Sequence, residues 1–251
     1  MTQKTFAAAA GPALACAFAL AGLAGPAHAD PVNATLGATY FQVPNTGVSP
    51  DFGGSGYPNL AIGSMLGPDG MPVVSSTDPG VTMVNSSNEL EWWTPSAIVT
   101  QTGTGTISLP YDSDMYAPNS TGTNDSQEFE TAVFKGDFTL SSSAVVSFQL
   151  GSDDDSFIYV DGVLIGQNPG IHGVTNVTFD SPTLDAGNHT IDVFYADRED
   201  TGAFLSLNLL SEGVTITPPP AIPEPGSWAL LVAGLGAAGA LARRRGTDAP
   251  R

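Results

Sequence analysis

Hydrophobic and polar residues alternate with a period of two along most of this chain. Val146, Phe148 and Leu150 share one face of a predicted strand, and the same alternation returns in residues 190–196 and 205–209. Such alternation is typical of strands with one buried face. No stretch between residues 30 and 222 keeps a period of 3.6 residues over three turns. The pattern therefore predicts an all-β domain.

Turn-forming residues separate these alternating runs. Asp161-Gly162 lies between Phe157–Val160 and Val163–Ile165, which is a strong signal for a hairpin with a two-residue turn. We interpret Asp161 as a turn residue rather than a ligand. Short strands joined by such turns favour an antiparallel β-sandwich.

Residues 30–128 show a looser pattern, with long stretches rich in Gly, Pro, Ser and Asn. Trp92 and Trp93 are adjacent, and strand alternation would send their rings to opposite faces. We therefore expect one ring in the core at most and the other at an edge or on the surface. Core packing and sugar stacking both remain open for this pair. The candidate strands of this part are residues 38–43, 81–84, 90–93 and 104–109.

The first residues have the pattern of a secretory signal peptide. Lys4 precedes the apolar run Phe6–Leu23, and Ala27 and Ala29 supply the small residues that signal peptidase requires. The expected partners are the Sec export machinery and signal peptidase, with cleavage before Asp30. The only cysteine, Cys16, is lost with this peptide, so the exported part has no disulfide and no thiolate metal site.

The last residues have the pattern of a stop-transfer segment. An apolar run from Trp228 to Ala242 is preceded by Pro223, Glu224 and Pro225 and followed by Arg243, Arg244 and Arg245. Arginines after an apolar run stay cytoplasmic. The run of about 15 residues is shorter than the roughly 20 that span a bilayer comfortably, which favours a transient inner-membrane anchor. An ordinary single-span anchor is the alternative.

These C-terminal elements resemble the PEP-CTERM sorting signal of Gram-negative bacteria. The resemblance implies that a membrane protease, exosortase, cuts near Pro223–Pro225 and releases the protein to the cell surface or the surrounding biofilm matrix. The expected organisation is a signal peptide (1–29), a loop-rich β part (30–128), a sandwich core (129–212), a Pro-rich linker (213–222), the sorting segment with a short transmembrane helix (223–245) and a cytoplasmic tail (246–251).

The exported part is strongly acidic. Residues 30–222 contain 23 Asp and Glu against only Lys135 and Arg198, a difference of −21. Such a surface repels nucleic acid and anionic lipid, so neither is an expected partner. It favours divalent cations instead.

The densest group of carboxylates is Asp153-Asp154-Asp155. Two unit charges about 4 Å apart repel by about 4 kcal/mol at an effective dielectric of 20. A Ca²⁺ ion would remove this cost and accepts loosely arranged oxygen ligands. The spacing is not that of an EF-hand. A solvated acidic turn and a Ca²⁺ site both remain open from these residues alone.

The surrounding sequence resembles the PA14 domain and the related fibro-slime domain over about residues 129–212. The residues that carry the resemblance are Phe138–Leu140, Val146–Leu150, Ser152–Asp154, Tyr159–Gly162, Gly170–His172, Leu184 with Gly187, Val193–Glu199 and, upstream, Ser49–Phe52.

In sugar-binding PA14 adhesins a pair of Asp residues holds Ca²⁺, and the ion binds sugar hydroxyls. The resemblance implies that Asp153 and Asp154 form this pair, with a cis peptide bond between them. It further implies a third ligand from the loop that holds Asp197, Glu199 and Asp200. Within this loop, we expect Arg198 to pair with its acidic neighbours or to orient one of them, close enough to contact carbohydrate.

The sequence thus predicts an exported, non-enzymatic β-sandwich that binds Ca²⁺ and carbohydrate, with exopolysaccharide or another glycan as partner. The alternative is a structural acidic matrix protein without a discrete site. A glycan hydrolase is a third reading, but no Gly-x-Ser-x-Gly, His-Glu-x-x-His or phosphate loop is present. We expect His172 and His189 to be hydrogen-bonding surface residues rather than metal ligands.

Overall fold

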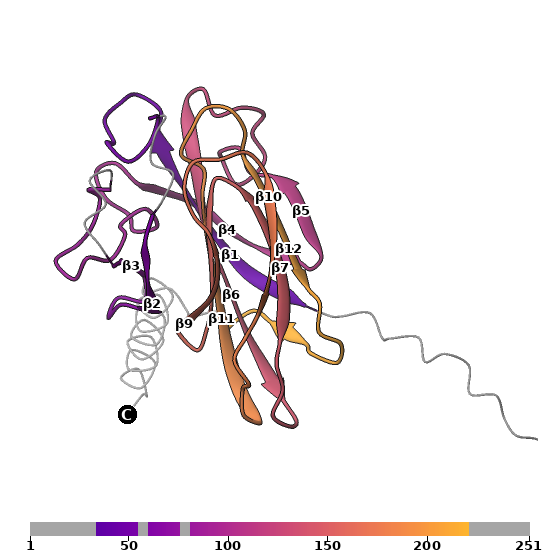
Figure 1. Ribbon diagram of the computed structural model, residues 1–251. Helices are drawn as coiled ribbons and strands as arrows, with labels where there is room; N and C mark the ends of the chain where they lie inside the picture. The colour runs from indigo at the N-terminus through magenta and orange to yellow at the C-terminus, as the bar shows by residue number, and fades with distance from the viewer. Residues whose placement is uncertain (1–33, 55–59, 76–80, 221–251) are drawn as a thin grey trace, which may run out of the picture.

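A computed structural model describes residues 34–54, 60–75 and 81–220. Within these ranges the chain forms thirteen strands and no helix, arranged as two facing antiparallel sheets (Figure 1). The predicted antiparallel β-sandwich is therefore confirmed. The predicted signal peptide and sorting segment lie outside the described residues. Among the described residues, no helix is long and apolar enough to cross a membrane.

The larger sheet has nine strands in the order β3, β2, β9, β8, β11, β6, β1, β4, with β13 also beside β6. Their bounds are Thr35–Pro44 (β1), Ile62–Leu66 (β2), Pro72–Val74 (β3), Thr100–Ser108 (β4), Glu128–Leu140 (β6), Asp155–Val160 (β8), Val163–Asn168 (β9), Gly187–Ala196 (β11) and Ile216–Thr217 (β13).

The smaller sheet has the order β10, β7, β12, β5. Its strands are Tyr111–Asp114 (β5), Ser147–Asp153 (β7), Thr175–Asp180 (β10) and Phe204–Leu209 (β12). Both sheets mix strands from before and after residue 128, because β1 pairs with β6 and with β4 in the larger sheet, while β5 pairs with β12 in the smaller one. The loop-rich N-terminal part is thus built into the same sandwich.

The space between the two sheets holds the inner hydrophobic cluster. Alternating residues of both sheets meet there, among them Leu36, Phe134, Phe148, Tyr195 and Leu205. The alternation that predicted the strands is what supplies this cluster, since every second side chain of a strand points to the same face.

The opposite face of the larger sheet carries an outer hydrophobic cluster. Phe129, Phe157 and Phe194 point outward from the sheet and are covered by the segment between β1 and β4, which supplies Trp92 and Trp93. Figure 1 shows this segment along one side of the larger sheet. Strands β8 and β11 are consequently buried on both faces over most of their length.

The prediction that only one of the two tryptophans could be buried is wrong. Trp92 is 0% and Trp93 1% exposed. The pair lies in a turn rather than a strand, so both rings can point to the sheet. Each indole N–H is satisfied, by Asp51 Oδ2 at 2.8 Å and by the Tyr195 carbonyl at 2.7 Å. Fully burying two such rings stabilises the domain by roughly 4–6 kcal/mol each.

The strands predicted in residues 30–128 are confirmed only in part. The predicted strands at residues 38–43 and 104–109 correspond to β1 and β4. Residues 81–84 and 90–93 contribute only isolated bridges, such as the one between Val84 and Leu90. The short strands β2, β3 and β5 were not predicted, because runs of three to five residues are too short to show a clear alternation.

The hairpin at Asp161-Gly162 is confirmed. It joins β8 to β9 with Val160 paired to Val163, and φ is +52° at Asp161 and +74° at Gly162. Two positive φ angles are what a tight hairpin turn requires. Asp161 also accepts hydrogen bonds from the Thr190 N–H and the His189 ring. His189 is therefore a buried residue, 8% exposed, which corrects the prediction of a surface histidine.

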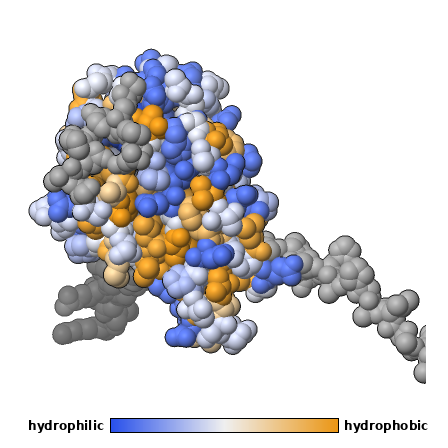
Figure 2. All heavy atoms as spheres, viewed as in Figure 1, coloured by the Kyte–Doolittle hydropathy of each residue, from blue (hydrophilic) through white to orange (hydrophobic). Residues whose placement is uncertain are grey.

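Both ends of the described chain lie together at one end of the sandwich. Ala34 bridges to Ile216, and Ile216 pairs with Phe138 near the end of β6. Ile216 is buried, so Ile216 and Thr217, which fall within the predicted linker, belong to the larger sheet as β13. Figure 2 shows hydrophobic and hydrophilic residues interspersed on the visible face.

Candidate functional site

The acidic residues singled out by the sequence lie where β7 passes into β8. Asp153 ends β7, Asp155 begins β8, and the peptide bond between Asp153 and Asp154 is cis, as the resemblance implied. Asp155 pairs with Ala196 at the end of β11. The loop that begins at Asp197 therefore leaves the sheet directly beside Asp154.

Backbone donors from two loops hold the Asp154 carboxylate. Its Oδ1 accepts the His172 N–H at 2.9 Å, and its Oδ2 accepts the N–H groups of Arg198 at 2.9 Å and Glu199 at 3.1 Å. Burial nevertheless raises the pKa of Asp154 to about 7. The carboxylate is fixed in place but costly to ionise without a nearby positive charge.

Asp197 is the most unusual residue of the site. Its side chain is 0% exposed, and neither carboxylate oxygen has a hydrogen-bond partner among the described residues. Burial raises its pKa well above the usual range, and the charges of Asp154, Asp125 and Asp153 raise it further, while the nearby Glu199 N–H opposes this only in part. An unpaired buried carboxyl facing other carboxylates carries a large desolvation cost.

Asp125 and Asp153 complete the acidic group. Asp125 is 5% exposed and accepts the Gly202 N–H at 3.3 Å. A Cβ atom at Gly202 would lie 2.8 Å from Asp153 Oδ2, and φ there is +146°, so glycine lets this loop approach the carboxylate. Burial also raises the pKa of Asp153. Sequence reasoning missed Asp125, because nothing in its Ser- and Thr-rich segment distinguishes it from a loop residue.

Arg198 supports the site from behind instead of facing solvent. It is 0% exposed and pairs with the equally buried Asp155, Nη1 to Oδ2 at 3.1 Å. Its Nε donates to the Asp51 carbonyl at 2.9 Å, and its guanidinium lies 4.7 Å from the centre of the Trp92 ring. The Arg198 side chain is thus buried behind the acidic residues, and its ion-pair partner is Asp155 rather than a sequence neighbour.

The structure thus brings Asp153, Asp154 and Asp197 together as predicted. Glu199 lies close enough for its charge to raise the pKa of Asp153, and Asp200 is exposed on the same loop. In the described part of the chain, no three Asp, Glu, His or Cys side chains already stand in the arrangement of a formed metal site. The acidic residues nevertheless fit a cation in their chemistry, because they offer only oxygen ligands and the Asp197 carboxylate has no hydrogen-bond partner among the described residues.

Residues 221–245 match the family model described as the PEP-CTERM protein-sorting motif. The chain carries a PEP-CTERM sorting signal. The motif marks an exported protein that is sorted to the cell surface, and this part of the predicted localisation is confirmed. A comparison with curated proteins found no match.

PA14 domains are among the solved structures that are similar to this chain. The PA14 sugar-binding domain from an RTX adhesin is 17% identical over 35% of this chain and 51% of its own, with a TM-score of 0.29. The chain therefore spans about half the length of that domain. The PA14 domain of the MpAFP antifreeze protein is 15% identical over 78% of this chain and 99% of its own, with a TM-score of 0.36.

The third similar structure is the Epithelial Adhesin 6 A domain from Candida glabrata, in complex with Galb1-3GlcNAc. It is 16% identical over 76% of this chain and 86% of its own, with a TM-score of 0.35. Parts of glycosidases, such as an α-xylosidase from Xanthomonas citri, match as well. Similarity at this level does not carry a ligand or an activity from one protein to another.

Proposed function

We propose that this protein is a non-enzymatic carbohydrate-binding module of the cell surface, and that it binds its ligand through a Ca²⁺ ion held by Asp153, Asp154 and Asp197. The observation that supports this most directly is the fully buried Asp197 carboxyl, which has no hydrogen-bond partner among the described residues and faces three further carboxylates. A cation at this point would satisfy all of them.

The chemistry of the group favours calcium over other cations. Ca²⁺ takes six to eight oxygen ligands in flexible geometry, and backbone carbonyls serve as well as carboxylates, whereas Mg²⁺ demands a tighter octahedron. Two or three Asp side chains with carbonyls from the neighbouring loops are therefore sufficient. When bound, the ion would supply open coordination positions that sugar hydroxyls can occupy.

The sorting signal supports the choice of ligand class. The protein is exported and sorted to the cell surface, where polysaccharides are abundant and Ca²⁺ is available. We infer that exosortase cleaves near Pro223–Pro225 and frees the domain from its transient anchor. The sequence resemblance to Ca²⁺-dependent PA14 adhesins points to the same class of ligand.

Calcium-linked stability tests the ion site. A ligand that binds only the folded state at a hundredfold excess over its Kd stabilises it by about 2.7 kcal/mol. The melting temperature of residues 30–222 should rise in millimolar Ca²⁺, and Asp153→Asn with Asp154→Asn should abolish most of the rise. Asp185→Asn, an acid-to-amide change in a distant turn, is the matched control. An equal rise with Mg²⁺ would indicate general charge screening and favour an acidic matrix protein without a site.

A glycan array tests the ligand. The array is run with Ca²⁺ and with chelator, using the wild type and the Asp153/Asp154 double variant. We expect binding only for the wild type in Ca²⁺. Binding that persists unchanged in chelator would place the sugar site elsewhere, whereas no binding together with intact Ca²⁺ stabilisation would leave a structural calcium site.

A further inference from the structure

The outer face of the smaller sheet leads away from the acidic site in register. Alternation along β7 places Gln149, Gly151 and Asp153 on the side opposite the buried Phe148 and Leu150. Asp153 therefore stands at one end of a line of outward positions. Positions two residues apart on a strand are separated by about 7 Å, so Gln149 lies about 13 Å from Asp153 along this line.

The neighbouring strands extend this line into rows of polar side chains. Gly151 is in register with Asn176 of β10 and Ser206 of β12, and Ser206 is in register with Asp112 of β5. Asn176 and Ser206 are joined across Gly151 at 3.1 Å. A Cβ atom at Gly151 would lie 2.0 Å from the Asn176 side chain. The glycine therefore leaves the space in which the Asn176 and Ser206 side chains meet.

A shallow cavity of about 300 Å³ lies over these rows, and Gln149, Asn176, Ser206 and Asn208 are among the residues that line it. These four side chains are uncharged and can each donate and accept hydrogen bonds. The single charged residue of the lining is Asp112, and no lysine or arginine takes part. Amides and hydroxyls without a cation suit a neutral polyhydroxylated ligand better than an anionic one.

Phe204 connects the acidic site with the polar rows. It is the register partner of Asp153 on β12, and it points outward because Leu205 and Leu207 point to the core. Phe204 is half-buried and belongs to neither the inner nor the outer hydrophobic cluster. An aromatic ring that does not pack in a core, next to polar side chains, is suited to lie against the apolar face of a sugar ring.

We infer that this outer face is a binding strip for a linear neutral polysaccharide, with Phe204 under the first units and the pairs Asn176/Ser206 and Gln149/Asn208 along the chain that follows. The inference rests on the proposed function, because it takes the ion site as the place where one sugar is held. It goes further in naming a polymer segment as the ligand.

Binding as a function of ligand length tests the strip. The probes are glucose, mannose and galactose and their linear homo-hexasaccharides, each titrated calorimetrically with Ca²⁺ and with chelator. For the sugar that binds, we expect the hexasaccharide to bind at least tenfold more tightly than the monosaccharide. Gln149→Ala with Asn208→Ala should lower the hexasaccharide affinity by about tenfold, the value of one or two net hydrogen bonds, and leave monosaccharide binding unchanged.

Controls separate the strip from the ion site. Thr139→Ala with Thr190→Ala removes two polar side chains from the larger sheet and should change neither affinity, and melting curves show that each variant is folded. Phe204→Ala should weaken the binding of both the monosaccharide and the hexasaccharide.

Two results would overturn the strip: a hexasaccharide that binds no better than its monosaccharide, or a Gln149/Asn208 variant with unchanged hexasaccharide affinity. In either case, Ca²⁺-dependent monosaccharide binding would still support the proposed function. Hexasaccharide binding in chelator that the Gln149/Asn208 variant loses would support the strip and overturn the ion. Absence of all binding by the wild type overturns both.

Discussion

At the scale of single residues, the buried charged side chains distinguish the candidate site from the rest of the described chain. Asp155 and Arg198 are both fully buried and satisfy each other, whereas Asp197 is buried among acids with no hydrogen-bond partner among the described residues. The first arrangement is a structural support for the site. The second is the feature that an ion would complete.

Asp197→Asn tests the residue on which the ion site depends. Burial, together with the charges of the neighbouring carboxylates, raises the pKa of Asp197 well above its usual range, so the neutral form of the side chain is favoured in the absence of an ion. An amide of the same shape should change the free energy of unfolding in chelator by less than about 1 kcal/mol. It should remove the stabilisation by Ca²⁺, because an amide cannot balance the ion's charge. Denaturant titration with and without Ca²⁺ gives both quantities, and a full Ca²⁺ increment in the variant would contradict the assignment.

Arg198→Met tests the buried ion pair. Leaving the Asp155 carboxylate buried without its partner should cost about 3–5 kcal/mol of unfolding free energy. Lys135→Met is the matched control, since the Lys135–Asp192 pair has a half-exposed lysine and should contribute less than about 1 kcal/mol. Combining Arg198→Met with Asp155→Leu should restore part of the loss in urea denaturation. A double variant that is less stable than the single one would contradict this account.

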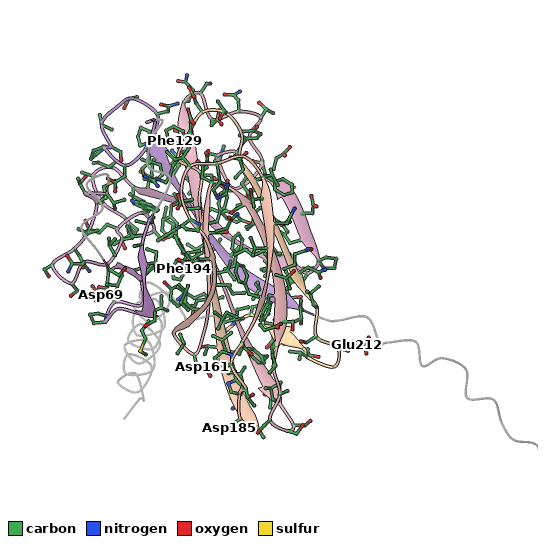
Figure 3. The ribbon with its side chains drawn as sticks, viewed as in Figure 1. Asp69, Phe129, Asp161, Asp185, Phe194 and Glu212 are labelled. Carbon is green, nitrogen blue, oxygen red and sulfur yellow. The ribbon has the colours of Figure 1, made fainter. Side chains whose placement is uncertain are left out.

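At the scale of elements, turns and strand ends place the chemistry. The β8–β9 turn and the start of β11 meet at the His189 ring, which lies between Asp161 Oδ2 at 2.7 Å and the Asp185 carbonyl at 2.9 Å. Its ring also stacks on Phe138. Figure 3 shows its two partners, Asp161 and Asp185, at the end of the sandwich opposite Phe129.

The His189–Asp161 contact predicts a pH dependence. The hydrogen bond to Asp161 raises the pKa of His189 above its usual 6.5. A histidine whose pKa is raised by folding adds stability that is fully present below pH 6.5 and is lost as the pH rises through the folded-state pKa. The free energy of unfolding of the wild type should therefore fall from pH 6 upward by more than that of Asp161→Asn.

Asn at position 161 keeps the turn, because Asn tolerates positive φ before Gly. The comparison is made by urea denaturation at several pH values, with His172→Gln as the control for the other histidine of the described chain. Parallel pH profiles for the wild type and Asp161→Asn would show that the contact carries no proton-linked stability.

At the scale of the whole molecule, the candidate site and the two ends of the described chain lie at opposite ends of the sandwich. Asp197 hydrogen-bonds the Glu130 carbonyl near the start of β6, while Ile216 pairs with Phe138 near its end. Eight residues of extended strand separate these levels by about 26 Å. A domain held through its C-terminal segment would thus present the acidic site on its far side.

Sorting is tested on the released protein. The motif at residues 221–245 predicts that the released form ends near residue 226 and lacks the Arg243–Arg245 triplet. Intact-mass measurement of the surface or culture fraction checks this. Replacing the three arginines by neutral residues should reduce membrane retention of the precursor, since positive flanks set the orientation. A released species that still contains the residues from Trp228 onward would contradict cleavage.

The sequence alone determined the features that depend on neighbours along the chain. Strand periodicity, the Asp161-Gly162 hairpin and the sorting signal are local patterns, because each is set by which residue types follow one another within about twenty positions. The cis bond between Asp153 and Asp154, and the position of Asp197 beside this pair, were predicted from the family resemblance. No local pattern contains such information about contacts between distant segments.

Only the tertiary structure decided the features that depend on segments far apart in the chain. The burial of both Trp92 and Trp93 follows from a turn lying across the outer face of the larger sheet, and the pairing of Arg198 with Asp155 follows from the register of β8 and β11. Asp125 joins the acidic group for the same reason, because its loop packs against the loop at Gly202. Residue types fix what a side chain can do, but burial and pairing depend on which distant segment covers it.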